Sequence, residues 1–443
     1  MTETSLAGAD SQAMARQVLH DRIIGCLFGS ALGDAVGLYT EFLSEELSIQ
    51  NYPERKFILS PLSQATPFRR DAHRNPHHPG EWTDDTDHAM LILLSYLHKD
   101  GSDISPQDVA VRLEIWVRQG LRALDTLPLG LGRTVGAIVR SKTYLDNPEA
   151  AARKHWANCG YTAAPNGSLM RTHPLGLMCL SKSLDGTFQL AADVSVITHV
   201  DPRCIVSCAI GTALIRGLVL NEIANESDID EVVSSAATWY SSLRSKHCDD
   251  AARMDEPDLD AEELHRHCRV SELSSLELDT AYKIGYVYKT LGSGIHTLRL
   301  AMRRVTESAT PLSTRRAVFE QLITDLIMLG GDADTNACFA GALLGSYLGY
   351  SSLPDNWGDG LLHGDWLMAK SEGLCQLLGV SQGSYKGSED GDTAPDGGRE
   401  FLSNNQLDEK AMTLQARMAK EETEWKVRQQ PPAKKLMPFF KWN

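Results

Sequence analysis

The sequence contains no uninterrupted apolar run of about 18 residues, the length that a membrane-spanning helix needs. It is also poor in basic residues, because 43 lysines and arginines face 58 aspartates and glutamates, for a formal net charge of -15. This balance argues against a nucleic-acid-binding surface, which is normally basic. We therefore expect small molecules or proteins as partners, and no membrane or nucleic-acid surface.

The cysteines show no pattern of a disulfide framework: there are nine in 443 residues, an odd number without regular spacing. The closest pair, Cys204 and Cys208, has the spacing of neighbours on a helix, not of a Cys-x-x-Cys motif. The first 17 residues lack the basic start and apolar stretch of a secretory signal. These features predict a reduced, intracellular protein, cytoplasmic or nuclear.

Alternating apolar and polar residues, the pattern of β-strands, do not extend over convincing lengths. Apolar residues instead recur at three- and four-residue spacing along most of the chain, which is typical of helices. With 42% hydrophobic and 23% charged residues, the composition is that of a globular protein. The sequence therefore predicts an all-α, compact multi-helix fold, interrupted by a polar surface excursion at about 247–274.

Composition divides the chain into a flexible N-terminus (1–17), a compact domain (18–380) and a linker with a C-terminal tail (381–443). The stretch 381–398 is rich in Gly, Ser and Asp, and we expect it to stay unordered because it cannot bury enough apolar surface. One amphipathic helix is predicted in the tail, at 407–427.

Two short acidic clusters lie far apart in the sequence, at 81–87 and 330–336. Each precedes an apolar stretch of helical character, so each is predicted to lie where a helix begins. A single acid or hydroxyl in each cluster could cap its helix, but the surplus carboxylates would repel one another. A hard divalent cation takes oxygen ligands, so one metal site shared by both clusters would remove that conflict. The oxygen-bearing residues are Thr83, Asp84, Asp85 and Asp87 in the first cluster, and Asp332, Asp334 and Thr335 in the second.

Two further features could belong to the same site. Glu41 follows a glycine-containing helix and is a plausible additional metal ligand, although alone it would be an ordinary surface glutamate. The glycine-rich turn at 129–134 precedes a helix and could offer backbone N–H groups to phosphate. Such turns are common, and this one lacks the Lys-Ser/Thr ending of a Walker loop.

Five motifs, in this order, resemble those of the ADP-ribosylglycohydrolase family over about Arg22 to Gly379. They are Gly33-Asp34-Ala35 with Glu41-Phe42, then Trp82-Thr83-Asp84-Asp85-Thr86, Pro165-Asn166-Gly167-Ser168-Leu169-Met170-Arg171, Thr198-His199, and Gly330-Gly331-Asp332-Ala333-Asp334-Thr335. The resemblance implies an all-helical fold with two Mg²⁺ ions (Mn²⁺ is an alternative) in a central cleft. It also implies a hydrolase that releases ADP-ribose from modified proteins or other ADP-ribose conjugates.

The resemblance assigns roles to individual residues. The implied ligands of one ion are Thr83, Asp84 and Asp85; those of the other are Glu41, Asp332 and Thr335, with Asp334 bridging the two. The implied substrate-binding residues are Gly130, Gly132, Arg133 and Thr134 for the diphosphate, Asn166, Gly167, Ser168 and Met170 for the ribose side, and His199 nearby. Asp85 or Glu41 would act as acid or base, and the two roles stay open between them. His199 either contacts the substrate or is a buried histidine satisfied by backbone groups.

Two other functional classes remain. A protein of the same fold could bind ADP-ribose without catalysis, and turnover with and without metal would separate the two. A metal-dependent phosphoesterase could use the same ion pair, although the two clusters themselves contain no histidine ligand. Arg171 is expected to be structural, paired with an acid.

Overall fold

The structure, a computed structural model, describes residues 3–246, 253–305 and 310–429. Within these ranges it contains α-helices and short 3-10 helices, with no β-strand beyond two isolated bridges. The predicted all-α fold is therefore confirmed. The helices of the body are α1 (Glu3–Gly37), α2 (Glu45–Asn51), α3 (Asp84–His98), α4 (Pro106–Gln119), α5 (Arg133–Val139), α6 (Pro148–Asn158), α7 (His173–Met178), α8 (Leu184–Ser195), α9 (Pro202–Val219), α10 (Glu226–Ser245), α11 (Ala261–Cys268), α12 (Val287–Arg304), α13 (Leu312–Ile327), α14 (Ala333–Leu348), α15 (Asp355–Gly358) and α16 (Gly364–Leu377).

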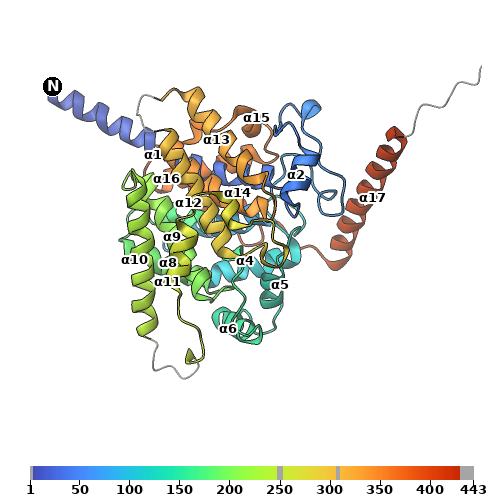
Figure 1. The fold of residues 1–443 in the computed structure, drawn as a ribbon, viewed down its shortest axis with the longest axis horizontal. Coiled ribbons are helices and arrows are strands. Elements are labelled where there is room, and N and C mark those ends of the chain that lie inside the picture. Colours follow the sequence, from blue (N-terminus) through green and yellow to red (C-terminus); the bar gives the residue numbers. More distant parts are fainter. Residues whose placement is uncertain (1–2, 247–252, 306–309, 430–443) are drawn as a thin grey trace, which may run out of the picture.

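The helices α1 and α14 pack against each other at the centre of the molecule (Figure 1). Their contact depends on glycines, because a Cβ added at Gly33 would collide with the carbonyl oxygen of Ala337. A Cβ at Gly37 would likewise collide with the backbone of Asp334. The close approach brings the C-terminal end of α1 beside the N-terminal end of α14, where one acidic cluster lies.

The helix α9 is long and apolar enough to cross a membrane by length and composition, with a mean hydropathy of 1.4. It is not an uninterrupted apolar run, because Arg203 and Arg216 lie within it. Of this helix, 89% is buried, and it packs against α7, α8 and α10. Its hydropathy is thus accounted for by a place in the protein core.

Part of the predicted polar excursion lies at 247–252, outside the described residues. The rest includes α11, which packs on α12 and buries Leu264 and Cys268. This segment also brings Glu263 to the wall of a cleft. The excursion is therefore not only a surface feature.

Residues 381–402 lie against the body, so the expectation that 381–398 is unordered is wrong. Thr393 is fully buried, and its carbonyl oxygen accepts a hydrogen bond of 2.8 Å from the Arg112 guanidinium. The ammonium of Lys370 pairs with Asp390 at 2.5 Å. Polar contacts to buried cations thus replace the apolar burial that the composition lacks. A final helix, α17 (Asn404–Gln429), contains the predicted helix at 407–427.

Candidate active site

A cleft of about 760 Å³ opens above the N-terminal ends of α3 and α14. The site residues predicted from the sequence line it, except Ser168 and Asp87. Ser168 is completely buried behind the cleft wall, where its hydroxyl accepts a hydrogen bond of 3.1 Å from Ser195. Its position gives it no contact with the cleft, which corrects the predicted ribose-side role.

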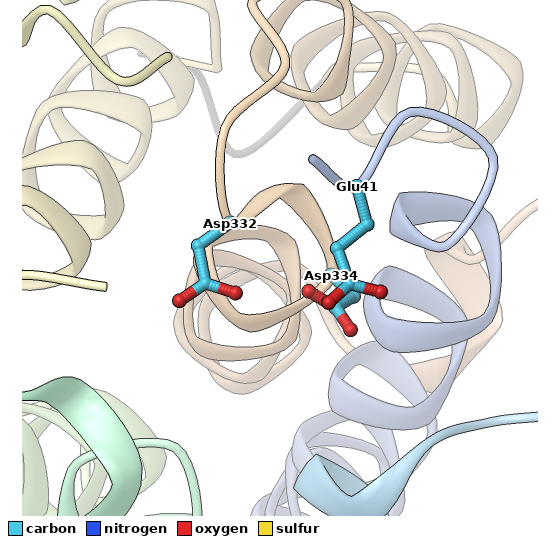
Figure 2. A group of neighbouring side chains, drawn as sticks. All are labelled: Glu41, Asp332 and Asp334. Atoms are coloured by element: carbon cyan, nitrogen blue, oxygen red, sulfur yellow. The ribbon is translucent and has the colours of Figure 1, made fainter. Parts of the chain in front are cut away.

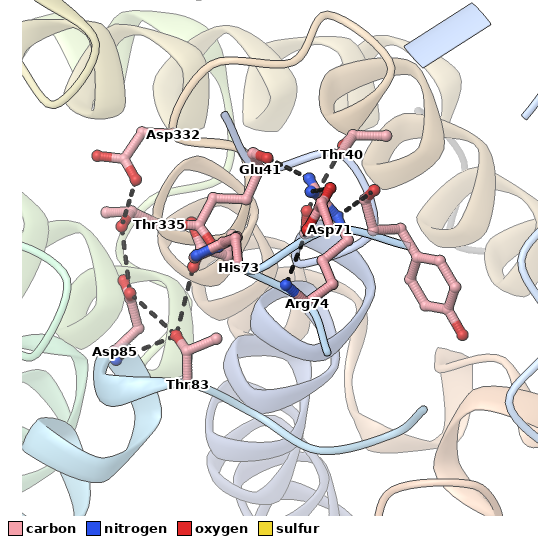
Figure 3. A network of polar contacts seen from close by, with 12 residues as sticks. Thr40, Glu41, Asp71, His73, Arg74, Thr83, Asp85, Asp332 and Thr335 are labelled. Atoms are coloured by element: carbon pink, nitrogen blue, oxygen red, sulfur yellow. Dashed lines mark hydrogen bonds and ion pairs between the residues drawn. The ribbon is translucent and has the colours of Figure 1, made fainter. Parts of the chain in front are cut away.

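The two acidic clusters meet at the floor of this cleft (Figure 3). Thr83 donates a hydrogen bond from Oγ1 to Oδ2 of Asp334, at 3.4 Å. In return, Thr335 donates from Oγ1 to Oδ2 of Asp85, at 3.2 Å. Segments about 250 positions apart in the chain therefore form one cluster, as the sequence predicted.

Three carboxylates project into a common space in Figure 2: those of Glu41, Asp332 and Asp334. One oxygen of each lies within 4.8 Å of the others, a spacing that could hold a metal ion. Glu41 follows α1, and the two aspartates begin α14, so the glycine contact between these helices sets the spacing.

The electrostatics of the cluster favour a cation. Burial raises the pKa of Asp84, Asp85 and Asp334 well above the ordinary aspartate value, and neighbouring carboxylates raise it further. Burial, followed by the charge of Glu41, raises the pKa of Asp332 to about 6. Oδ1 of Asp85 is buried without a hydrogen-bond partner. Such an unsatisfied oxygen is costly unless a proton or a cation occupies it, so these residues fit a hard divalent ion.

Helix capping explains only part of the cluster. Thr83 is the N-cap of α3, and its side chain accepts a hydrogen bond from the backbone N–H of Asp85. Asp332 occupies the N-cap position of α14 but makes no side-chain capping bond. Asp84, Asp85 and Asp334 are therefore present beyond what capping requires.

Asp34 binds the backbone of the first acidic cluster, a role that the sequence analysis did not assign. It is fully buried on α1 and accepts hydrogen bonds from the backbone N–H groups of Thr83 and Thr86, each at 3.0 Å. Oγ1 of Thr86 donates a further bond at 2.6 Å. The available signal was a lone carboxylate within an apolar, glycine-rich helix.

The loop at 69–78 covers the Glu41 side of the cleft (Figure 3), and its contacts with Glu41 were not predicted from the sequence. His73 lies with Nε2 at 2.5 Å from the Glu41 carboxylate. Arg74 is buried and donates to the carbonyl oxygens of Tyr39 and Glu41. This loop therefore fixes both the backbone and the side chain of Glu41. Its density of arginine and histidine was the signal in the sequence.

The glycine-rich turn before α5 forms another wall. Gly130 has a positive φ of 81°, and a Cβ there would collide with the Asp84 carboxylate. The turn therefore needs glycine both for its backbone conformation and for its contact with the acidic cluster. Across the cleft, Asn166 donates from Nδ2 to Oδ2 of Asp332 at 2.9 Å. The turns at Gly130 and Asn166 thus both touch the acidic cluster.

The far end of the cleft is aromatic and charged. The Tyr286 hydroxyl donates to Glu263 at 2.8 Å, and the Arg203 guanidinium lies 5.7 Å from the Tyr286 ring centroid. Lys283 lies 5.7 Å from the same ring. The sequence analysis did not find these residues, because no spacing pattern links them.

His199 lines the cleft and is almost completely buried. Among the described residues Arg171 has no acidic partner, contrary to expectation. It donates to Oγ1 of Thr198 at 2.6 Å, and that oxygen lies 2.8 Å from Nδ1 of His199. A guanidinium can only donate, so the Thr198 hydroxyl hydrogen is free to point at Nδ1. Burial, followed by the charge of Arg171, lowers the pKa of His199 well below its ordinary value, so the ring is neutral. The proton of a neutral ring accepting at Nδ1 lies on Nε2, which has no partner within the described residues.

Comparisons with known proteins identify a family for the chain. A family profile described as ADP-ribosylglycohydrolase matches residues 15–386. An ADP-ribosylarginine hydrolase of Serratia proteamaculans is 26% identical over 354 residues, which cover 80% of this chain and 79% of that protein. An ADP-ribosylhydrolase of Bos taurus is 24% identical over 368 residues, covering 79% and 91%. A solved structure titled ADP-ribosylglycohydrolase-related protein complex gives a TM-score of 0.49 at 21% identity, over 82% of this chain and 99% of that chain. Because the profile spans most of the sequence, the chain belongs to the ADP-ribosylglycohydrolase family, whose members are glycosidase-type hydrolases.

Proposed function

We propose that this protein hydrolyses the C1″ glycosidic bond of ADP-ribose attached to protein side chains, or of a related conjugate, and releases ADP-ribose. The observation that carries the proposal is the joined acidic cluster, with its unpartnered Asp85 oxygen, beside the turns at Gly130 and Asn166. A single cleft then offers a cation site and a glycine-rich turn with backbone N–H groups for one ligand.

Two divalent ions, Mg²⁺ or Mn²⁺, are the proposed cofactors. Their proposed ligands are Thr83, Asp84 and Asp85 for one ion, and Glu41, Asp332 and Thr335 for the other, with Asp334 between them. When bound, the ions would supply positive charge that orients the vicinal ribose hydroxyls and makes a nearby water more acidic.

The residues of the chain divide the remaining tasks. Cleavage at C1″ develops oxocarbenium character, so a carboxylate near that carbon stabilises the charge. We assign the base role to Asp85, because its Oδ1 is free, whereas the Glu41 carboxylate is engaged by His73. The proposed diphosphate contacts are Gly130, Gly132, Arg133 and Thr134, and the proposed ribose-side contacts are Asn166, Gly167, Met170 and His199.

The test is release of ADP-ribose from a panel of defined linkages, with Mg²⁺, with Mn²⁺ and with chelator. Arginine-linked ADP-ribose is the first substrate to try, since the Serratia relative is named for that linkage. Metal-dependent release supports the proposal. Binding without turnover would instead indicate an ADP-ribose-binding protein, and release of AMP or phosphate would indicate a phosphoesterase.

The variant Asp334→Asn tests the proposed metal-ligand role of this residue. This change removes one charge at the centre of the cluster but little volume, so we expect turnover to fall by at least about 100-fold while the helical circular dichroism spectrum is kept. Asp103→Asn is the control, because the Asp103 side chain is 90% exposed. Near-normal rates and metal affinity for Asp334→Asn would contradict the proposed ligand role.

A further inference from the structure

The C-terminal part of the described chain lies beyond the family match, which ends at residue 386. It consists of a strap, residues 387–402, and the helix α17, which stands at the side of the body (red in Figure 1). These residues are therefore an addition to the shared catalytic fold. Their contacts indicate what the addition does.

The strap fixes the start of α17 to the body. Gln119 holds both backbone polar groups of Leu402, with bonds of 3.2 Å to the carbonyl oxygen and 2.8 Å from the N–H. The Arg122 guanidinium donates to the carbonyl oxygen of Glu400 at 3.0 Å. A Cβ added at Gly397 would collide with the backbone of Ala123. The beginning of α17 therefore has little freedom to move.

The first half of α17 contacts the segment that leads into the glycine-rich turn. The Lys410 ammonium donates to the side chain of Asp125 at 2.6 Å and to its carbonyl oxygen at 3.0 Å. Asp125 has a positive φ of 56°, an uncommon conformation for aspartate that this double contact helps to hold. Gly130, five residues later, packs against Asp84 in the acidic cluster.

The second half of α17 contacts the loop on the opposite side of the cleft mouth. The Arg417 guanidinium lies against the carbonyl oxygen of Pro76 and the imidazole of His78. Glu421 lies 3.6 Å from Arg70 in the same loop. His77, between the two Arg417 contacts, is buried and lines the cleft. One helix thus bridges the two loops that form walls of the cleft.

These contacts come from a few charged side chains. Between α17 and the body runs a groove of about 530 Å³, lined in part by Leu127, Leu402 and Leu414. Since the helix is not packed continuously, a single substitution on α17 can remove its contact with one of the two cleft loops without disrupting the core.

We propose that α17 is a specificity element, which holds the loop at 69–78 in place so that the cleft accepts ADP-ribose attached to a folded protein. The inference rests on the proposed function. A protein acceptor must pass over the cleft mouth and contact the outer face of this loop, where Arg70 is partly exposed. A single modified amino acid does not reach that face. A fixed loop spares the protein substrate the entropy cost of ordering it on binding.

The test compares three variants of the full-length protein: Arg417→Ala, Lys410→Ala and the control Lys420→Ala. Lys420 is exposed on the same helix. Hydrogen exchange of the peptides covering 69–81 and 122–132 is measured without substrate. The values of kcat/KM are then measured for an ADP-ribosylated protein and for the corresponding ADP-ribosylated amino acid.

For Arg417→Ala we expect faster exchange at 69–81 and a loss of about 3- to 10-fold in kcat/KM on the modified protein, with less than about a twofold change on the modified amino acid. Lys410→Ala should speed exchange at 122–132, and Lys420→Ala should change neither quantity. Unchanged exchange, or equal losses on both substrates, would overturn the proposal. Absence of turnover in the parent protein would refute the proposed function instead, and the exchange data would still report on the loop. Arg417→Lys serves as a second variant should Arg417→Ala fold poorly.

Discussion

Asp87 is a buried carboxylate held between two indoles, with bonds of 2.8 Å from Trp82 and from Trp116. Burial raises its pKa to about 7, although the two indole bonds oppose the shift. In the unfolded chain the carboxyl titrates near 3.8. Between these values the folded state binds more protons than the unfolded state, so this residue destabilises the protein as pH rises through that window.

We therefore expect the stability of the parent, relative to Asp87→Asn, to decline as pH rises from about 5 to about 8, because the variant cannot titrate at this position. Urea unfolding of the metal-free proteins at several pH values measures the difference. A stability difference that stays constant over this range would show that Asp87 is ionised throughout it.

The contact between Thr198 and His199 leads to a second residue-scale prediction. If the Thr198 hydroxyl donates to Nδ1, nitrogen NMR of His199 should show the neutral ring with its proton on Nε2 near pH 7. Thr198→Val removes the donor, so we expect a mixture of tautomers and ADP-ribose affinity lower by on the order of tenfold. The matched control is Thr212→Val, since the buried Thr212 hydroxyl has no partner among the described residues. An unchanged tautomer in Thr198→Val would contradict the assignment.

The prediction that the two acidic clusters lie together is confirmed, and it rested on the surplus of carboxylates at two helix starts. It failed where a role depends on which way a side chain points. Ser168 lies within a predicted motif, but its side chain faces the core. Arg171 was expected to pair with an acid, yet its partner is Thr198. Neighbours in space, such as His73 beside Glu41, leave no trace in spacing along the chain.

Among the elements, the crossing of α1 and α14 determines the geometry of the cleft. Glycines recur along α1, and a Cβ added at Gly25, Gly29, Gly33 or Gly37 would collide with α14 or with the residues that follow it. For the strap, the prediction of an unordered segment was wrong. Its composition lacks apolar residues, but Arg112 and Lys370 offer buried cations to its oxygens. The composition of a segment shows how much apolar surface it can bury, but it does not show which polar partners the folded body provides.

Gly33→Ala tests the importance of this crossing. The added methyl group would collide with backbone of α14, not with a flexible side chain, so we expect a loss of about 1–3 kcal/mol in the free energy of unfolding. Affinity for Mg²⁺ should fall as well, because the shift separates Glu41 from Asp334. Urea denaturation and calorimetric titration measure the two effects. Gly358→Ala is the control, because a Cβ at Gly358 meets nothing within 4 Å. A variant as stable as this control would show that the helices can separate without cost.

At the scale of the whole molecule, the cleft joins segments from both halves of the chain around one acidic floor. A net charge of -15 makes this body a poor partner for a free anion at long range. Binding of a diphosphate therefore has to depend on local donors and on bound cations. ADP-ribose, the proposed ligand, is longer than AMP and ribose 5-phosphate, so we expect it to contact more of the cleft, whose lining includes both the acidic cluster and Tyr286.

A thermal shift titration with Mg²⁺ present should consequently rank ADP-ribose above AMP and ribose 5-phosphate. A ligand at one hundred times its dissociation constant stabilises the folded state by about 2.7 kcal/mol, which is enough to resolve as a shift of several degrees. The increment should shrink with chelator and in Asp334→Asn, because the ribose end then loses its cations, but should persist in Asp103→Asn. Equal shifts for all three ligands would show that recognition is confined to a phosphate, which would favour the phosphoesterase alternative over cleavage at C1″.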